Sequence, residues 1–357
     1  MKTAGIICEY NPFHNGHKLH IEKTRSALSP ECIVCVMSPN VVQRGEIAIA
    51  DMYFRAEKAI ENGADLVLSI PPRFTLQSAQ FYAHYGVYIL DALGGVDYLS
   101  FGSESGSVDE LEKALLEISD EKIKENLKSG KTYGACISEN EILRCSNNIL
   151  GVEYIKALKK LNSKIVPYTV KREYTEHNSK ESFENFASAS FIRELIKENK
   201  DYSRFLPYQD KIQHSSYDDA LGLLLSYKLN LGDGNNFSDI MNISEGLENR
   251  ILKYKSCTDL EKIVSEIYCK RYIAPRIRRA ILSIIFDLKK SDALPTYTRV
   301  LALNDNGKRY LNRAKKTSTI KIYSRITKKD IYNDPFLAEE IKINSIIDNI
   351  KNQKRSF

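Results

Sequence analysis

Short apolar runs alternate with helix-like stretches through the first half of the chain. The runs rich in β-branched residues have the length of buried strands and are expected at residues 4–10, 32–37, 66–70, 98–101 and 164–170. Helices are expected after the first strand and at residues 50–62, 78–93 and 190–198. Strands that alternate with helices form a parallel sheet covered by helices. The pattern therefore predicts an α/β fold with a Rossmann-like parallel sheet.

The pattern changes beyond about residue 200. Amphipathic helices are expected at residues 217–231, 244–254, 259–268 and 276–288, and two short strands at residues 298–303 and 318–323 within this helical region. A chain of 357 residues has the length of about two ordinary domains. We therefore expect a sheet domain over residues 1–200 and a mainly α-helical region over residues 201–357.

Charge is distributed unevenly along the chain. The net charge of +6 is modest for this length. Residues 251–357, however, hold 24 basic and 11 acidic side chains, so the rest of the chain is net negative. We expect the C-terminal region to attract polyanions, and the N-terminal domain to repel them.

Two features bear on the compartment. No run of about 18 apolar residues occurs and no leader pattern opens the chain, so we expect a soluble, cytoplasmic protein. The seven cysteines are an odd, scattered set, which favours reduced thiols over disulfides. Cys32 and Cys35 have a metal-like spacing, but residues three apart on a strand face opposite ways, so we expect buried thiols and no metal.

The loop after the first strand contains His14, Gly16 and His17 just before a predicted helix. Free N–H groups at a helix N-terminus favour an anion, and two imidazoles one turn apart can donate to phosphate oxygens. This order of elements resembles the nucleotidylyltransferase superfamily and the class I aminoacyl-tRNA synthetases, which bind ATP there. Two alternatives stay open: an ordinary polar loop, and a zinc site that also uses His20.

Further polar residues follow other predicted strands and so lie at the same edge of the sheet. They are Gln43, Arg44 and Arg172, and Gly102 at the end of the fourth strand would let a nucleotide lie against the backbone. Asn147 and Asn148 offer adjacent amides suited to a base or ribose edge, and Arg193 lies in the first turn of a helix that follows small hydroxyl residues. Ser190 is expected to cap the helix that carries Arg193. For each residue the plain alternative is a solvated loop, a turn or a helix cap.

Taken together, these segments resemble the bacterial tRNA(Met) cytidine acetate ligase family. The resemblance rests on EYNPFHNGH at residues 9–17, QRGE at 43–46, FGSESG at 101–106, NNILG at 147–151, SEGLENR at 244–250 and RIRRA at 276–280. It implies a nucleotidylyltransferase-type sheet domain and an enzyme that activates acetate with ATP as acetyl-adenylate. The acetyl group would then pass to N4 of the wobble cytidine of elongator tRNA(Met), with release of AMP and pyrophosphate.

The resemblance also implies site residues. The ATP contacts that it carries over are Ile7, Cys8, Glu9, Tyr10, Asn11, Pro12, Phe13, His14, Asn15, Gly16, His17, Lys18, Leu19, His20, Gly102, one of Asn147 and Asn148, and Arg172. This chain departs from the family at three positions, with Pro39 where Gly is usual, Val41 where an aromatic residue is common and Ser146 in place of Pro.

The residue chemistry fits such a reaction. The exocyclic amine of cytidine is a poor nucleophile, so acetate needs activation as a mixed anhydride, which positioning and charge stabilisation can promote. We expect His14 and His17 to stabilise the phosphates, with Arg44 and Arg193 as further catalytic candidates and Mg²⁺ on the triphosphate. The candidates for tRNA phosphates are Arg276, Arg278, Arg279, Lys315 and Lys316.

Two other functions explain part of the sequence. A nucleotidylyltransferase that adenylylates a small phosphorylated metabolite, as pantetheine-phosphate adenylyltransferases do, accounts for the first domain but gives the basic C-terminal region no purpose. A non-catalytic RNA-binding protein with a vestigial nucleotide fold would act without ATP. No protein partner is inferred from the sequence.

Overall fold

The computed structural model describes residues 1–117, 136, 140–172, 184–212, 217–231 and 237–353. Its centre is a seven-stranded sheet with the order β7-β6-β1-β2-β5-β8-β9. The strands are β1 (Thr3–Cys8), β2 (Cys32–Met37), β5 (Leu66–Ser69), β6 (Tyr98–Ser103), β7 (Val166–Lys171), β8 (Tyr297–Leu303) and β9 (Lys321–Tyr323). The first five strands in chain order pair in parallel, which confirms the predicted α/β fold.

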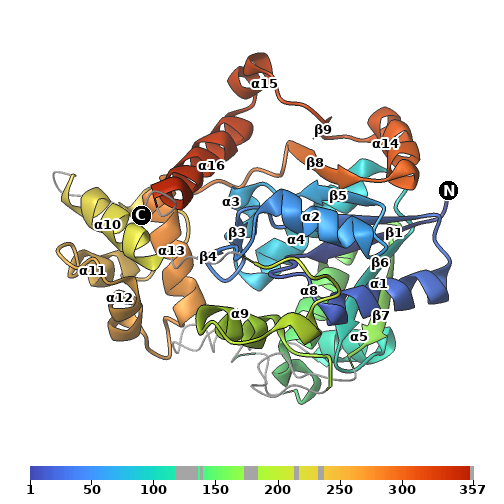
Figure 1. Ribbon diagram of the computed structural model, residues 1–357, viewed down its shortest axis with the longest axis horizontal. Helices are drawn as coiled ribbons and strands as arrows, with labels where there is room; N and C mark the ends of the chain where they lie inside the picture. The colour runs from blue at the N-terminus through green and yellow to red at the C-terminus, as the bar shows by residue number, and fades with distance from the viewer. Residues whose placement is uncertain (118–135, 137–139, 173–183, 213–216, 232–236, 354–357) are drawn as a thin grey trace.

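Helices cover both faces of the sheet (Figure 1). One face packs on α1 (Asn15–Leu28) and α2 (Met52–Glu61). The other packs on α4 (Ala79–Leu93), α5 (Val108–Glu117), α8 (Ser146–Lys160) and α14 (Asp305–Thr317). Cys32 and Cys35 of β2 belong to the cores on opposite faces, so the prediction of buried, separated thiols is confirmed.

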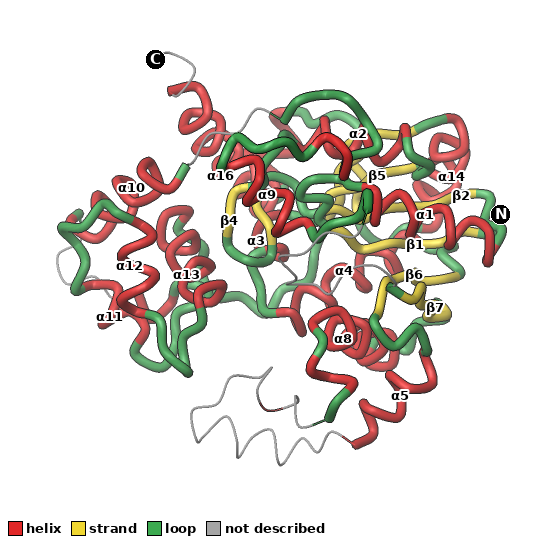
Figure 2. Tube along the Cα trace, turned by 60° about the horizontal axis from the view of Figure 1, so that its bottom comes forward, coloured by secondary structure: helices red, strands yellow, loops and turns green. Residues whose placement is uncertain are grey.

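A helical cluster lies beside the sheet (Figures 1 and 2). It consists of α10 (Asp218–Asn230), α11 (Leu247–Leu252), α12 (Leu260–Ile267) and α13 (Ala274–Phe286). These helices share one apolar core with the last part of α16 (Pro335–Gln353). Four of the amphipathic segments seen in the sequence thus pack against one another. No helix among the described residues is long and apolar enough to span a membrane.

Residues 298–303 and 318–323 contain strands, as expected, but the expectation that these strands lie within the helical region is wrong. Both segments join the sheet, where β8 pairs antiparallel with β5 and β9 pairs in parallel with β8. The reason is physical: all four residues of β5 are buried, so this strand needs a hydrogen-bonding neighbour on each side. A strand's own pattern does not say which strand that neighbour is. The boundary near residue 200 stays a prediction.

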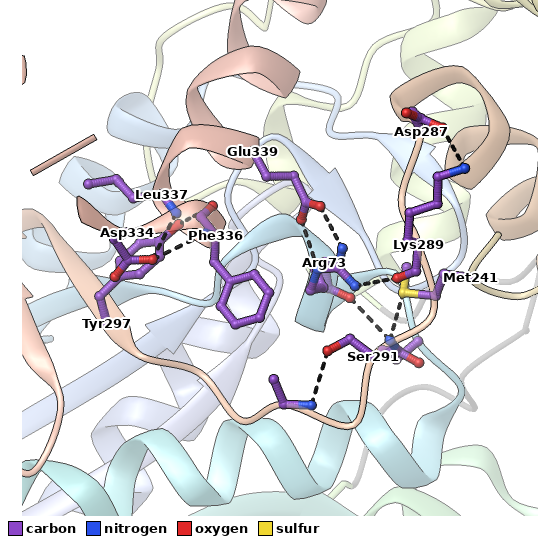
Figure 3. A network of polar contacts seen from close by, with 12 residues as sticks. Arg73, Met241, Asp287, Lys289, Ser291, Tyr297, Asp334, Phe336, Leu337 and Glu339 are labelled. Carbon is purple, nitrogen blue, oxygen red and sulfur yellow. Dashed lines mark hydrogen bonds and ion pairs between the residues drawn. The ribbon is translucent and has the colours of Figure 1, made fainter. Parts of the chain in front are cut away.

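A polar network ties the helical cluster to the sheet (Figure 3). Arg73, on the short helix α3 (Pro72–Thr75), donates to both carboxylate oxygens of Glu339 on α16, at 2.9 and 2.6 Å. Its third nitrogen donates to the carbonyl of Lys289, in the segment between α13 and β8, at 2.6 Å. Such a forked arginine contact fixes orientation as well as distance, so α16 and the cluster are held in a set position.

The remaining elements are small or connect these parts. They are β3 (Val41–Val42), β4 (Glu46–Ile47), α9 (Ala189–Lys197) and α15 (Lys328–Asn333). The hairpin formed by β3 and β4 follows β2, and α9 packs its apolar side against residues that follow this hairpin, including Ile49. Both elements therefore lie at the carboxyl edge of the parallel strands, where open α/β sheets bind ligands.

Candidate nucleotide-binding site

The loop after β1 is folded tightly by its own aromatic residues. Tyr10 has a φ of 47°, a left-handed conformation that non-glycine residues rarely adopt, and its side chain is buried. Its ring packs edge-on against Phe13 and His17, with centroids 4.8 Å apart in each pair. Such strain persists only where the surroundings hold it, and it is common at binding sites.

His14 and His17 form the start of α1. The backbone N–H of Gly16 donates to Nδ1 of His14 at 3.0 Å, and the backbone N–H of His14 donates to Nδ1 of His17 at 3.3 Å. The two rings stack with centroids 3.7 Å apart. Because each Nδ1 accepts a hydrogen bond, the proton of each neutral ring lies on Nε2, which leaves two N–H donors at this helix N-terminus.

Burial keeps these rings uncharged. It lowers the pKa of His14 to about 3, with Arg172 and Arg193 adding to the effect. Burial likewise lowers the pKa of His17 well below its usual value. At neutral pH both rings are therefore neutral donors, and an incoming phosphate meets them without displacing a counter-ion.

His20 serves another part of the fold. Its Nε2 hydrogen-bonds Ser100 Oγ of β6 at 2.9 Å, and burial lowers its pKa to about 4. With the Nδ1 atoms of His14 and His17 engaged by the backbone, the three rings do not share a ligand position. Among the described residues no group of three His, Cys, Asp or Glu side chains is arranged to hold a metal ion.

Asn147 and Asn148 occupy the first turn of α8, opposite the end of β6. The Oδ1 of Asn148 accepts from the backbone N–H groups of Glu104 and Ser105, at 2.8 and 3.1 Å, and its Nδ2 donates to the carbonyl of Ile142. Asn147 donates from Nδ2 to the Glu104 carboxylate at 2.6 Å. Both polar atoms of the Asn148 side chain thus hold the loop in place, whereas the half-buried Asn147 lies at the surface of the site.

Arg172 and Gly102 complete this side of the site. Arg172 follows β7, and its Nε lies 3.9 Å from the same Glu104 carboxylate. Burial lowers its pKa and Glu104 opposes that shift. A Cβ placed on Gly102 would lie 3.5 Å from the Arg172 side chain, an ordinary contact. The free protein therefore does not itself require glycine at position 102.

The hairpin places Gln43 and Arg44 beside the first loop. The backbone N–H of Gln43 donates to the Glu9 carboxylate at 2.7 Å. Burial raises the pKa of Glu9, while this hydrogen bond, Arg193 and Arg44 oppose the rise. Two arginines thus add positive potential at the mouth of the site.

α9 begins one residue earlier than expected, and its cap lies two residues earlier. Its cap is Ser188, whose Oγ accepts from the backbone N–H of Phe191 at 3.1 Å, so the prediction of Ser190 as the cap is wrong. Ser190 lies within the first turn, and its Oγ accepts from Arg193 at 3.2 Å. Arg193 also donates to the carbonyl of Asn11 at 2.8 Å, which brings it to the first loop as the sequence suggested.

Arg55 is a site residue that the sequence analysis missed. It is buried on α2 and donates to the carbonyls of Glu9 (2.5 Å), Ser38 (3.0 Å), Ala50 (3.1 Å) and Pro39. Burial lowers its pKa to about 10, so it stays charged. The signal in the sequence was an arginine on the apolar face of a helix, next to Ala56 and three or four residues from Met52 and Ala59, which lie on the same face.

The proposed tRNA contacts differ in how accessible they are. Arg279 is only 7% exposed and donates to the carbonyl of Gln43 at 3.1 Å, so the expectation of an accessible phosphate contact there is wrong for the free protein. Arg278 pairs with Asp218 and Glu261, and Arg276 with Glu245. Lys315 and Lys316 on α14 are exposed. The helical face around α13 therefore offers less free charge than its sequence indicates.

Comparisons with known proteins agree with this geometry. The family model of HIGH Nucleotidyl Transferase matches residues 1–357. A tRNA(Met) cytidine acetate ligase of Clostridium botulinum (strain Okra / Type B1) is 35% identical over 397 residues, which cover 99% of this chain and 96% of the relative. Its counterpart in Clostridium kluyveri (strain NBRC 12016) is 37% identical, with 92% and 90% covered.

Solved structures agree as well. Thermotoga maritima TmcAL in its apo form superimposes with a TM-score of 0.87 at 30% identity, covering 96% of this chain and 92% of that one. The same protein bound with alpha-thio ATP superimposes with a TM-score of 0.82. At this identity and coverage the likeness extends over the sheet and the helical cluster together.

Proposed function

Because this chain belongs to the HIGH nucleotidyl transferase family and, within it, to the tRNA(Met) cytidine acetate ligase family, we propose that it is an ATP-dependent acetate ligase acting on tRNA. It joins acetate to the α-phosphate of ATP with release of pyrophosphate. It then transfers the acetyl group to N4 of the wobble cytidine of elongator tRNA(Met), releasing AMP.

One observation carries the proposal: the stacked, neutral pair His14 and His17 at the start of α1. Their Nε2–H groups, at the positive end of the α1 dipole, form a donor pair for phosphate oxygens. The relative from Thermotoga maritima holds an ATP analogue on the same fold, which supports ATP as the ligand of this edge.

The ATP contacts extend over the first loop and two neighbouring strand ends. We assign them to residues 7–20, Gly102, Asn147 and Arg172. We prefer Asn147 to Asn148 because both the oxygen and the nitrogen of the Asn148 side-chain amide hold the loop, and because Asn148 is buried whereas Asn147 is half-buried. Mg²⁺ would enter with the triphosphate and would neutralise part of its charge.

Activation is an in-line displacement at the α-phosphate. An acetate oxygen forms the new P–O bond while the bond to the bridging oxygen breaks, and pyrophosphate leaves with that electron pair. His14 and His17 stabilise the charge on the α-phosphate and the leaving group as hydrogen-bond donors. Arg44 and Arg193, at the mouth of the site, attract the triphosphate and oppose its charge.

Transfer follows without a covalent enzyme intermediate. The N4 amine of cytidine attacks the carbonyl carbon of acetyl-adenylate, the C–O bond to AMP breaks, and the amine loses a proton. Arg55 acts as a positioning residue, since it holds the carbonyls at the ends of β1 and β2. The cytoplasm, where ATP and tRNA are present, is the compartment that we propose.

The function is tested by acetate-dependent exchange of labelled pyrophosphate into ATP, followed by AMP release with and without tRNA(Met). His14→Ala and His17→Ala should each lower the exchange rate by ~10²-fold, the loss usual for an oxyanion donor. His84→Ala, a half-buried histidine on α4, is the matched control and should leave the rate unchanged.

Two outcomes would contradict the proposal. Unchanged exchange in both variants would remove the histidines from the mechanism. Exchange that ignores acetate but responds to a phosphorylated metabolite would favour the adenylylating alternative.

A further inference from the structure

A groove of about 490 Å³ lies beside β8, away from the nucleotide site. It is lined by Tyr53 of α2, by residues 299–303 of β8 and by residues 323–326, which follow β9. β9 pairs with β8 only from Tyr297 to Arg299. Beyond that point β8 has β5 on one side and, among the described residues, no strand on the other. The groove therefore runs along an open strand edge.

The charge around the groove is strongly positive. Residues 305–329 hold nine Lys and Arg residues and one acidic residue, Asp305. Lys315 donates to Ser324 Oγ at 3.3 Å, so its ammonium lies at the rim, and Arg325 is exposed there. Arg299, by contrast, is neutralised by Glu340 at 2.5 Å. Free charge is thus concentrated where Lys315 and Arg325 meet the groove.

Two tyrosines of the groove each offer a group to a ligand: Tyr323 its hydroxyl and Tyr53 the face of its ring. Tyr323 is 9% exposed, and its buried hydroxyl has no hydrogen-bond partner in the part of the chain that the structure describes. Buried hydroxyls in folded proteins are nearly always hydrogen-bonded, so an orphaned one in a groove indicates a ligand. Tyr53 is 46% exposed while Arg299 holds its hydroxyl at 2.9 Å. A fixed, half-exposed ring is suited to stacking on a base.

We propose that this groove binds an unpaired segment of the RNA substrate, an inference that rests on the proposed function. Lys315 and Arg325 contact backbone phosphates, the Tyr323 hydroxyl donates to a sugar or phosphate oxygen, and a base stacks on Tyr53. Three strand spacings separate β1 from β8, ~14 Å in all, and Tyr53 belongs to a helix on the same face as α1. One tRNA can therefore reach both sites.

Filter binding of tRNA(Met) at several salt concentrations tests the groove. The double variant Lys315→Ala with Arg325→Ala should bind on the order of tenfold more weakly. Its slope of log K against log salt should fall by something like 0.7 to 0.9 for each lost phosphate contact. Tyr53→Ala should weaken binding with the slope unchanged, because a stacked base releases no counter-ions. Lys113→Ala, an exposed lysine on α5, is the matched control.

The two proposals fail separately. Absence of acetate-dependent pyrophosphate exchange in the unmodified protein, measured without tRNA, would overturn the proposed function. Unchanged tRNA affinity in all groove variants would overturn the groove as an RNA site and leave its free strand edge for an extended peptide. A reduced slope with no effect of Tyr53→Ala would also overturn it, because general attraction of a polyanion then explains the binding.

Discussion

Helices α13 and α14 look alike in the sequence and differ in the structure. Both are amphipathic and carry adjacent basic residues, RIRRA in α13 and RAKK in α14. On α13, Arg276 and Arg278 pair with carboxylates and Arg279 is buried against the hairpin. On α14, Lys315 and Lys316 are exposed. Similar charge in a sequence thus serves packing in one helix and remains free for a ligand in the other.

Counting charge by region agrees with this difference. Residues 217–290, which contain the helical cluster, hold twelve basic and ten acidic residues. The basic excess of the C-terminal part is densest in residues 305–329, which belong to the sheet side of the molecule. The comparison teaches that the positive surface and the helical cluster, which the sequence analysis treated as one region, are different parts of the fold.

The largest effect is expected where α13 meets the hairpin. Gly45 has a φ of 82°, and a Cβ there would lie 2.5 Å from the backbone nitrogen of Arg279. Gly45→Ala should lower the free energy of unfolding by ~3 to 4 kcal/mol, because left-handed strain and overpacking add. Urea unfolding measures the loss.

Gly246→Ala is the control for this substitution. Gly246 has nearly the same φ, 81°, but the nearest atom to its added Cβ is a side-chain nitrogen at 3.9 Å. Gly246→Ala should therefore lower the free energy of unfolding only through left-handed backbone strain, by ~1 to 2 kcal/mol. Equal losses at the two glycines would mean that α13 does not press on the hairpin.

Arg279→Ala should have the next largest effect. The substitution leaves a cavity and a carbonyl of Gln43 without its donor, which together cost ~2 to 3 kcal/mol of unfolding free energy. Lys316→Ala on α14 should change stability by less than ~0.5 kcal/mol. Thermal or urea unfolding of both variants checks the contrast, and a similar response of the two would abolish it.

Lowering the pH should destabilise the protein through its buried histidines. Burial lowers the pKa values of His14, His17 and His20 in the folded protein below the usual ~6.5 of the unfolded chain. The unfolded state therefore binds protons first, and stability is lost as pH falls through 6.5 toward the folded values. Between pH 7 and pH 6 protonation of the three rings in the unfolded chain should together lower the free energy of unfolding by about 2 kcal/mol.

This pH effect is measured by urea unfolding at pH 7.0, 6.5 and 6.0. The three histidines are not among the proposed phosphate contacts of tRNA, so the salt slope of tRNA binding should not change over this range. A flat stability profile would show that the three histidines are not buried in a neutral form.

The smallest effect in free energy is expected for tRNA binding. Lys315→Ala with Lys316→Ala should weaken binding about tenfold, ~1.4 kcal/mol, and flatten the salt slope by ~1.5. Arg278→Ala should leave the slope nearly unchanged, because Asp218 and Glu261 already neutralise that arginine. Filter binding at several salt concentrations compares them, and a flatter slope in Arg278→Ala would show that tRNA displaces those carboxylates.

Much of the fold was predictable from local pattern. The five parallel strands lie within a few residues of their expected positions, because each is a short buried run between turn-forming residues. The helices α5, α8, α14, α15 and α16 were not predicted, so the sequence analysis did not place Asn147 and Asn148 in the first turn of a helix. Polar residues in a first helical turn resemble those of a loop, so the ambiguity is inherent in composition.

By itself the sequence determined the parallel sheet, the histidine loop at its carboxyl edge and the family to which the chain belongs, because these depend on residues close together along the chain. Only the tertiary structure decided that β8 and β9 complete the sheet, that Arg55 holds the strand ends, and that Arg279 is buried while Lys315 is exposed. The physical reason is that pairing, burial and neutralisation of charge depend on partners distant in sequence. Asp218 and Arg278, sixty positions apart, meet only in the folded chain.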